Sequence, residues 1–396
     1  MAEPALLVTA GRPARLVLEA GSRSWSLGPP GREVTVQLRR PAGLAAALGG
    51  SSGLASAYAS GAWECADLTG LVRWLLWSLR RPMRAFDALG RLLGPAVSYL
   101  AGGAGPTKAA DRRRVRAHYD LPMVLFEAML DETLTYSCAL FEDPGQPLAD
   151  AQRAKLDRAC AKLELGPRDH VVEIGSGWGS LAIHAASRYG CRITTTTVSE
   201  SQLELARARV ERAGLSRLVT VVGEDYRDLG GAYDKLVSIE MVEAVDWRRH
   251  DAYFSSCQRL LRPGGLMLLQ AIVMEEASYE RAKLHRDFIR RQVFPGSCIP
   301  SVSALRSSLA RATSMEVVGV EDIGCHYPLT LRRWRQNLEA RWADLQEAGL
   351  PADLLRRWRL YLSYCEAAFL EGHISDVQML LRRPRAAPGA RAKGDG

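Results

Sequence analysis

The chain has 396 residues, of which 47% are hydrophobic and 24% charged, so it is long enough for two domains and too apolar to be disordered. A formal net charge of +8 favours anionic partners, among them phospholipid headgroups, nucleic acids and acidic metabolites, without choosing between them. Eight cysteines occur without any C-x-x-C pair, which predicts reduced thiols and excludes a zinc knuckle or a disulfide framework.

The first hundred residues predict a small α+β module. No charged-then-apolar leader opens the chain and no apolar run is long enough to cross a membrane, so we expect a cytoplasmic protein. Alternating apolar and polar positions over residues 12–42 indicate two short strands joined by a Gly-Pro-Pro-Gly turn. Residues 44–79 have helical periodicity, interrupted at Gly-Gly-Ser-Ser-Gly and at Gly61-Ala62-Trp63. Residues 71–81 place Trp74 and Trp77 beside arginines, which suits an interfacial helix or a core helix with charged ends.

A flexible-linker composition at residues 102–106, Gly-Gly-Ala-Gly-Pro, marks the expected boundary between two domains. We assign residues 1–100 to a domain that either binds lipid or substrate or is accessory, and residues 101–385 to a catalytic domain. Residues 386–396, rich in Arg, Pro, Ala and Gly, are expected to be a disordered tail.

Strands and helices alternate from about residue 150. The predicted strands cover residues 170–174, 191–198, 218–222, 235–239 and 266–272. The predicted helices cover residues 181–189, 200–214, 253–261, 331–345 and 354–369. This alternation predicts an α/β domain with a Rossmann-like, doubly wound and mostly parallel sheet.

The junction after the first of these strands carries the spacing E-x-G-x-G-W-G. Its glycines let the backbone turn sharply and approach a ligand closely. An acidic residue at the strand end suits the cationic amino-acid end of S-adenosylmethionine (SAM), whereas it would repel a pyrophosphate. The loop residues assigned to SAM on this basis are Glu173, Gly175, Gly177, Trp178 and Gly179.

Two further places complete the predicted SAM site. After the second strand, Thr197 and Gln202 offer neutral hydrogen bonds to the ribose hydroxyls, where a typical Rossmann enzyme carries an acid. After the third strand, Glu224 and Asp225 provide acceptors where the adenine amino group should lie. With an Arg-Pro-Gly-Gly turn before the last strand, this order of features predicts a SAM-dependent methyltransferase.

Other motifs are spread over residues 112–381. They are H-Y-D-L at 118–121, T-Y-S-C-A-x-F at 135–141, M-V-E at 241–243, F-P-G at 294–296, H-Y-x-x-T-L at 326–331 and Y-L-x-x-C-E-A-x-F-x-x-G at 361–372. Together with the glycine loop, they resemble the cyclopropane-fatty-acid and mycolic acid cyclopropane synthases. A weaker match over residues 53–63 extends the resemblance upstream.

This resemblance implies that the double bond of an unsaturated fatty acyl chain on a phospholipid attacks the methyl group of SAM and becomes a carbocation. A bound bicarbonate ion then removes a proton from the new methyl group and a cyclopropane closes. Such a cation needs carboxylate charge, aromatic faces and exclusion of water.

The resemblance also assigns residues. Those of the bicarbonate pocket are Cys138, Glu243, Ile272 and Tyr327, with Cys138 and Ile272 contributing backbone groups. Those that cover SAM are Tyr119, Tyr136 and Ser137. The expected partners are acyl chains at the inner face of a membrane, with no nucleic acid and no metal, and a homodimer is left open.

Two positions depart from the family pattern. The family's late-strand histidine, in an L-H-T-I context, is Gln270 here, and its E-H-V is Glu243-Ala244-Val245. Glutamine can hold an anion through its amide but cannot carry a proton near neutral pH. A methylene- or methyl-branched acyl chain is therefore a second candidate product.

Two single residues admit more than one interpretation. Cys365 is a catalytic candidate or, as a helical cysteine among apolar neighbours, a core residue. His326 is a structural residue or a base. The chain as a whole could instead methylate a small molecule, or bind lipid without catalysis.

Overall fold

The computed structural model describes residues 11–40, 50–78, 121–283, 289, 293 and 297–385. The chain divides into two compact units. The first comprises residues 1–155, 272–302 and 322–376, and the second comprises residues 156–271, 303–321 and 377–396. The expected domain boundary at residues 100/101, its linker and the tail from residue 386 lie outside the described residues, so they stay predictions.

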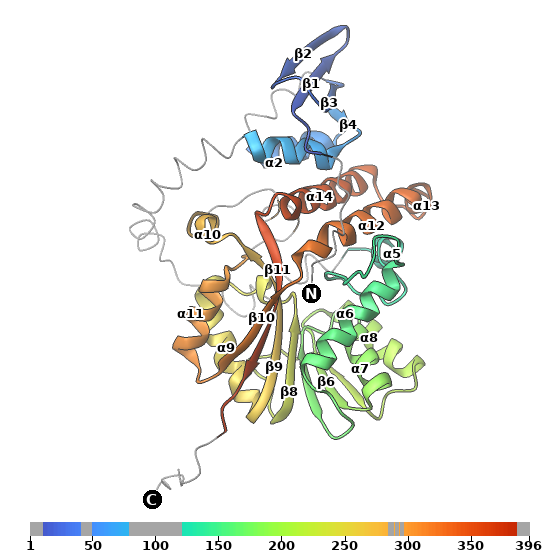
Figure 1. The fold of residues 1–396 in the computed structure, drawn as a ribbon. Helices are drawn as coiled ribbons and strands as arrows, with labels where there is room; N and C mark the ends of the chain where they lie inside the picture. Colours follow the sequence, from blue (N-terminus) through green and yellow to red (C-terminus); the bar gives the residue numbers. More distant parts are fainter. Residues whose placement is uncertain are drawn as a thin grey trace, which may run out of the picture. The chain divides into compact units, whose positions relative to one another are not determined.

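A four-stranded sheet opens the first unit (Figure 1). Its strands, in the spatial order β2-β1-β3-β4, are β1 (Arg15–Ala20), β2 (Arg23–Leu27), β3 (Glu33–Leu38) and β4 (Trp63–Cys65). The two predicted strands exist as β1 and β3, but they are parallel neighbours and not a hairpin. The expectation missed β2, which pairs antiparallel with β1, because its five residues are all exposed and only two are apolar.

The helices of the first unit follow the predicted periodicity in most places. The helix α2 (Gly50–Ala59) begins at Gly50, whose φ is +61°, and residues 41–49 lie outside the described residues, so the first predicted interruption stays a prediction. The second interruption is confirmed, since Gly61 has a φ of +74° and β4 follows. A further helix covers residues 68–78. No helix among the described residues is long and apolar enough to cross a membrane.

Later parts of the chain complete the first unit. Its remaining helices are α5 (Met123–Met129), α10 (Glu276–Ala282), η5 (Gly324–His326), α12 (Tyr327–Ala340), α13 (Trp342–Glu347) and α14 (Ala352–Leu370). The helix predicted over residues 331–345 is therefore two helices, separated at Arg341. The one predicted over residues 354–369 is confirmed as α14.

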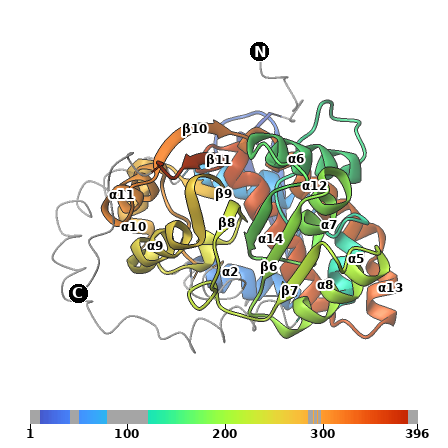
Figure 2. The same cartoon turned by 90° about the horizontal axis from the view of Figure 1, so that it is seen from below.

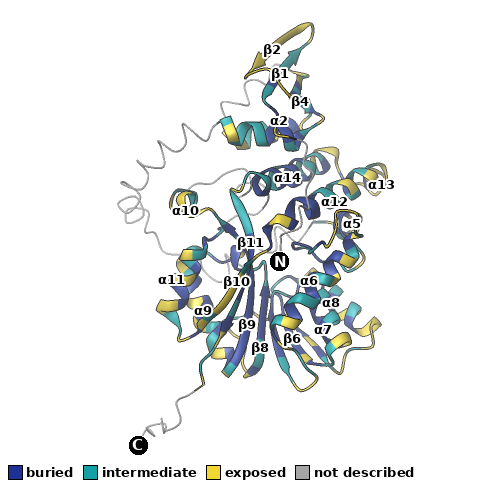
Figure 3. Ribbon diagram, in the orientation of Figure 1, coloured by how far each residue is buried: buried dark blue, intermediate teal, exposed yellow. Residues whose placement is uncertain are grey.

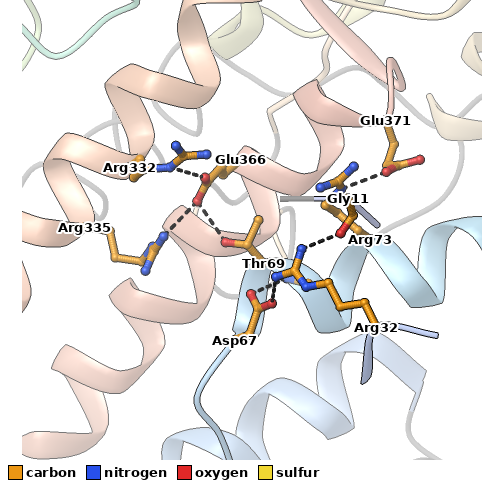
Figure 4. A network of polar contacts seen from close by, with 10 residues as sticks. Gly11, Arg32, Asp67, Thr69, Arg73, Arg332, Arg335, Glu366 and Glu371 are labelled. Carbon is orange, nitrogen blue, oxygen red and sulfur yellow. Dashed lines mark hydrogen bonds and ion pairs between the residues drawn. The ribbon is translucent and has the colours of Figure 1, made fainter. Parts of the chain in front are cut away.

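Charged residues join α14 to the helix over residues 68–78 (Figure 4). Glu366, whose side chain is almost fully buried, accepts hydrogen bonds from Arg332 at 2.9 Å, Arg335 at 3.0 Å and Thr69 at 2.8 Å. One turn later, Glu371 accepts from Arg73 at 2.8 Å. The N-terminal module is thus tied to the C-terminal helices by buried charges.

The second unit is built on a seven-stranded sheet in the order β10-β11-β9-β8-β5-β6-β7. Its strands are β5 (His170–Ile174), β6 (Arg192–Thr196), β7 (Val219–Val222), β8 (Tyr233–Ile239), β9 (Leu261–Met274), β10 (Glu316–Asp322) and β11 (Ile374–Arg382). The pairs β5–β6, β5–β8, β6–β7 and β8–β9 are parallel. This order confirms the Rossmann-like, mostly parallel sheet.

Helices cover both faces of this sheet, with α7 and α8 on one side and α9 on the other (Figure 2). The helices are α6 (Leu148–Lys162), α7 (Ser180–Tyr189), α8 (Glu200–Arg212), α9 (His250–Leu260) and α11 (Val302–Ala312), with the short η2 (Val242–Ala244) and η3 (Trp247–Arg249) after β8. Because both faces are covered, β8 and β9 are largely buried (Figure 3). The chain order reverses between β5 and β8, so their carboxyl ends form the switch point at which such sheets bind ligands.

Candidate active site

The glycine loop between β5 and α7 has the backbone that the sequence predicted. Gly175, Gly177 and Gly179 have φ values of +97°, +48° and +86°, a region that other residues adopt only at a cost. A Cβ atom on Gly175 would lie 3.0 Å from Cγ of Met241, which follows β8. The loop therefore packs closely on the residues after β8 at Gly175, whereas no atom lies within 4 Å of a Cβ atom placed on Gly177.

Glu173 lies near the end of β5 and is buried beside the second strand. Its carboxylate accepts a hydrogen bond from Thr195 Oγ1 at 2.6 Å, and the two residues are cross-strand neighbours. A buried carboxylate must be hydrogen-bonded to remain charged at low cost. The structure thus holds a buried carboxylate two residues before the first glycine of the loop, which suits the ammonium group of SAM.

Thr197 and Gln202 lie together at the end of β6. Thr197 Oγ1 donates to Gln202 Oε1 at 2.7 Å, and both side chains are buried. Ser199 caps α8 and accepts from the backbone N–H of Gln202. The two ribose candidates are therefore positioned by the turn that starts α8.

The adenine candidates after β7 differ from each other. Asp225 is buried and its carboxylate pairs with the Arg227 guanidinium at 2.6 Å, while its other oxygen accepts the backbone N–H of Arg227 at 3.1 Å. Glu224 is exposed, and its backbone carbonyl accepts from Thr196 Oγ1. Asp225 therefore shapes the turn, and Glu224 is the better placed acceptor for an amino group.

Two carboxylates follow β8 at the switch point. Glu243 lies in η2 and is buried, with 9% of its surface exposed. Glu240, which the sequence analysis missed, has a φ of +48° and accepts a hydrogen bond from Gln270 Nε2 at 2.9 Å. Its position directly after a buried strand was the signal that could have identified it.

In the first unit, the predicted cofactor-covering residues lie among aromatic rings and buried polar groups. The Tyr136 ring lies 5.1 Å from that of Trp334, and its hydroxyl is 3.1 Å from the hydroxyl of Tyr361. Ser137 accepts a hydrogen bond from the buried Lys155 at 2.7 Å. Gln152 donates to the Ser137 carbonyl at 2.8 Å. The segment is thus fixed by α6 and α12.

Cys138 and Tyr327 are brought to the same part of this unit. The Cys138 thiol is buried and points to the carbonyl of Ile323 at 3.8 Å. His326 Nδ1 accepts the backbone N–H of Phe141 at 3.2 Å, which supports the structural interpretation of that histidine. Tyr327 begins α12, and its ring lies 4.3 Å from the Phe369 ring.

The candidate residues divide between the two units. The first holds Tyr136, Ser137, Cys138, Ile272, Tyr327 and Cys365, which is partly buried in α14. The second holds the glycine loop, the ribose and adenine candidates, Glu243 and Gln270. Tyr119 and the F-P-G motif lie outside the described residues.

Comparison with known proteins gives the family. Residues 107–379 match the family model of the mycolic acid cyclopropane synthetases. The tuberculostearic acid methyltransferase UfaA1 of Mycobacterium tuberculosis is 36% identical over 380 residues, which are 94% of this chain and 88% of that protein. The cyclopropane-fatty-acyl-phospholipid synthase of Escherichia coli is 33% identical over 345 residues, 84% of each chain.

Two solved structures support the same family. The cyclopropane synthase MmaA2 of Mycobacterium tuberculosis shares 28% of its sequence with this chain and superposes with a TM-score of 0.64, over 68% of this chain and 98% of that one. The mycolic acid cyclopropane synthase CmaA1, complexed with SAH and CTAB, gives 30% identity and the same TM-score and coverage. This chain therefore belongs to the mycolic acid cyclopropane synthetase family and is a SAM-dependent, lipid-modifying methyltransferase.

Proposed function

We propose that this enzyme transfers a one-carbon unit from SAM to the double bond of an unsaturated fatty acyl chain of a phospholipid. The observation that carries the proposal is the buried carboxylate Glu243, which follows β8 and lies two residues after Met241, the residue that packs on Gly175 of the glycine loop. A methyltransferase acting on oxygen or nitrogen needs a base for its substrate, whereas alkene methylation creates a cation that a carboxylate stabilises.

The residues of the chain have separable tasks in this reaction. SAM, when bound, supplies an electrophilic methyl group. Glu243 opposes the positive charge that develops on the acyl chain. The resemblance assigns Tyr136 and Tyr327 to this reaction, and their rings pack against those of Trp334 and Phe369. Their task would be to offer aromatic faces to the cation and to exclude water, which would otherwise trap the cation as an alcohol. The names of the two relatives, a tuberculostearic acid methyltransferase and a cyclopropane-fatty-acyl-phospholipid synthase, support an acyl substrate.

The proposal has two further parts, which are the group that accepts the proton and the structure of the product. The resemblance implies that bicarbonate accepts the proton and that a cyclopropane forms. A methylene-branched chain is a second candidate, and Gln270 favours it because this amide, placed where the family has a histidine, binds the Glu240 carboxylate. Comparing turnover in bicarbonate-depleted and bicarbonate-containing buffer tests the first acceptor, and the chromatographic identity of the product separates the two candidates.

We also propose that the first unit contacts the lipid surface. Trp25 and Leu27 lie on the same face of β2, and they are 48% and 49% exposed. Trp77 is 46% exposed, and the Arg12 guanidinium lies 5.1 Å from its ring centroid. Tryptophan and arginine together suit the boundary between headgroups and acyl chains. Of the other tryptophans considered for this role, Trp63 is buried and Trp74 half-buried.

Expression in a host with unsaturated phospholipids, grown on methyl-labelled methionine, tests the proposed function. Mass spectrometry of the total fatty acids should show unsaturated chains that have gained one labelled carbon. A Glu243→Gln variant is the control and should show only trace incorporation. Unlabelled fatty acids, together with methylation of a small metabolite, would replace the proposal by small-molecule methylation.

A further inference from the structure

A line of hydrogen bonds crosses the edge of the large sheet within the second unit. Lys162 Nζ, at the end of α6, donates to Gln378 Oε1 at 2.6 Å. Gln378 Nε2, on β11, donates to Gln270 Oε1 at 3.1 Å, and Gln270 Nε2, on β9, donates to Glu240 Oε1 at 2.9 Å. We call this line the amide relay. Gln270 and Gln378 are buried, at 0% and 1% exposure.

The direction of the amide relay follows from its two ends. The Lys162 ammonium group can only donate, so the carbonyl oxygen of Gln378 must face it. The amide nitrogen of Gln378 then faces Gln270, whose own nitrogen is left facing Glu240. A glutamine amide alone could be turned either way, but a lysine at one end and a carboxylate at the other admit a single orientation. The relay is therefore built to present an N–H group to a negative charge.

Glu240 is held at the ligand-binding end of the sheet. It follows β8 directly, its backbone N–H donates to the Gln270 carbonyl at 2.9 Å, and the next residue, Met241, packs on Gly175 of the cofactor loop. A glutamate with φ of +48° is uncommon, since such a backbone costs about 1 kcal/mol or more outside glycine. Strain of this kind persists only where the surrounding structure enforces it, and it clusters at functional sites.

We infer that Glu240 is the proton acceptor of the reaction and fills the place on the Gln270 amide that an exogenous anion would otherwise take. Gln270, Gln378 and Lys162 are its positioning residues. The inference rests on the proposed function. A bicarbonate ion bound to the same amide nitrogen would lie against the Glu240 carboxylate, and two adjacent negative charges repel each other in a partly buried site.

The proposed reaction needs no reactant other than SAM and the unsaturated acyl chain, with Glu240 as the base. The π electrons of the double bond form the new C–CH₃ bond as the S–CH₃ bond breaks, and the other alkene carbon becomes cationic. Glu240 takes a proton from the new methyl group, and the released C–H electron pair closes a cyclopropane on that cation. If a hydride first shifts from the methylated carbon to the cationic one, the same proton loss gives an exocyclic methylene group.

Two substitutions at residue 240 test this assignment in purified protein with vesicles of an unsaturated phospholipid. Glu240→Gly removes the carboxylate, suits the positive φ and vacates the Gln270 amide. Glu240→Gln keeps the shape but cannot accept the proton. In bicarbonate-depleted buffer the wild-type rate should be unchanged, while both variants should lose about a hundredfold or more, the scale of a lost general base. Bicarbonate or formate should restore Glu240→Gly and not Glu240→Gln.

Two results would overturn the inference. They are a wild-type rate that falls when bicarbonate is removed, and a Glu240→Gly variant that retains the wild-type rate. SAM affinity, measured by calorimetry, reports whether each variant is folded. If the wild type methylates no lipid in any buffer, the proposed function itself fails, and that outcome is distinct from a failure of the Glu240 assignment.

The positioning role of the amide relay has its own readout. Gln378→Leu removes the donor to the Gln270 carbonyl oxygen, so the amide is held less firmly against Glu240, and kcat should fall about tenfold while KM for SAM stays unchanged. The cation should live longer, and the share of water-trapped hydroxy fatty acid should rise. Restoring polarity with Gln378→His should recover much of the wild-type product ratio. A product ratio identical in wild type and Gln378→Leu would show that the relay is only structural.

Discussion

Glu366 in the first unit, which is buried, and Glu240 in the second, which is half-buried, show two ways of holding a carboxylate. Glu366 is bound by two arginines and a threonine, so its negative charge is compensated by cations (Figure 4). Glu240 is bound by the amide of Gln270, which is neutral. An ion pair compensates the charge of a carboxylate, whereas a neutral amide orients a carboxylate without bringing a positive charge. The first arrangement joins helices, and the second serves a reaction.

The largest effect is expected from a substitution in the glycine loop of the second unit. Gly175→Asp would force a side chain against Met241, 3.0 Å from the ideal Cβ position, in a backbone that disfavours it. We expect SAM binding to be lost in calorimetry, while the first unit keeps its fold. Gly214→Ala, at a positive φ but with no atom within 4 Å of its Cβ position, is the matched control. Wild-type SAM affinity in Gly175→Asp would remove the loop from the cofactor site.

The structural carboxylate should affect stability. Glu366→Ala leaves Arg332 and Arg335 without their shared partner, which should lower the free energy of unfolding by about 3 kcal/mol, at the low end for a buried pair because both arginines are partly exposed. Urea denaturation measures this change. The exposed pair of Asp353 with Arg357 provides the control, since Asp353→Asn should cost about 0.5 kcal/mol or less. Equal effects of the two variants would contradict the structural role of Glu366.

A substitution of Glu243 should lower the turnover rate and leave stability unchanged. Glu243→Gln removes the charge that opposes the cation, so the turnover rate should fall by roughly two orders of magnitude with SAM affinity and stability unchanged. Steady-state rates, calorimetry and urea denaturation on one preparation separate these quantities. A parallel collapse of SAM affinity would move Glu243 from the substrate to the cofactor.

Thiol labelling gives the smallest expected effect. Burial raises the pKa of Cys191 to about 11 and that of Cys257 to about 12, so both thiols stay protonated and unreactive at pH 8. Cys325 is exposed and should be alkylated first, as peptide mass spectrometry can show. Early labelling of Cys257 would mean that α9 opens far more readily than its packing suggests.

Sequence reasoning succeeded where local pattern decides structure. The strands β5 to β9 and the glycine loop were predicted because buried parallel strands and left-handed glycines leave local signatures. It missed β2, β10 and β11, whose partners are distant or whose residues do not alternate cleanly.

At the candidate site, the sequence showed that Gln270 replaces a histidine but not what the amide binds. Gln378 lies 108 residues from Gln270, and Lys162 lies 216 residues from Gln378. No local pattern connects them, because the sheet order brings β9 and β11 together only in the fold.

One isotope experiment tests the central claim, that a double bond is methylated and the new methyl group then loses a proton. Purified protein is given SAM with a fully deuterated methyl group and vesicles of a monounsaturated phospholipid, and the fatty acids are weighed by mass spectrometry. We predict acyl chains that have gained one carbon bearing two deuterium atoms, whether the product is a cyclopropane or a methylene-branched chain. Chains that retain all three deuterium atoms, or no labelled chains at all, would contradict the account.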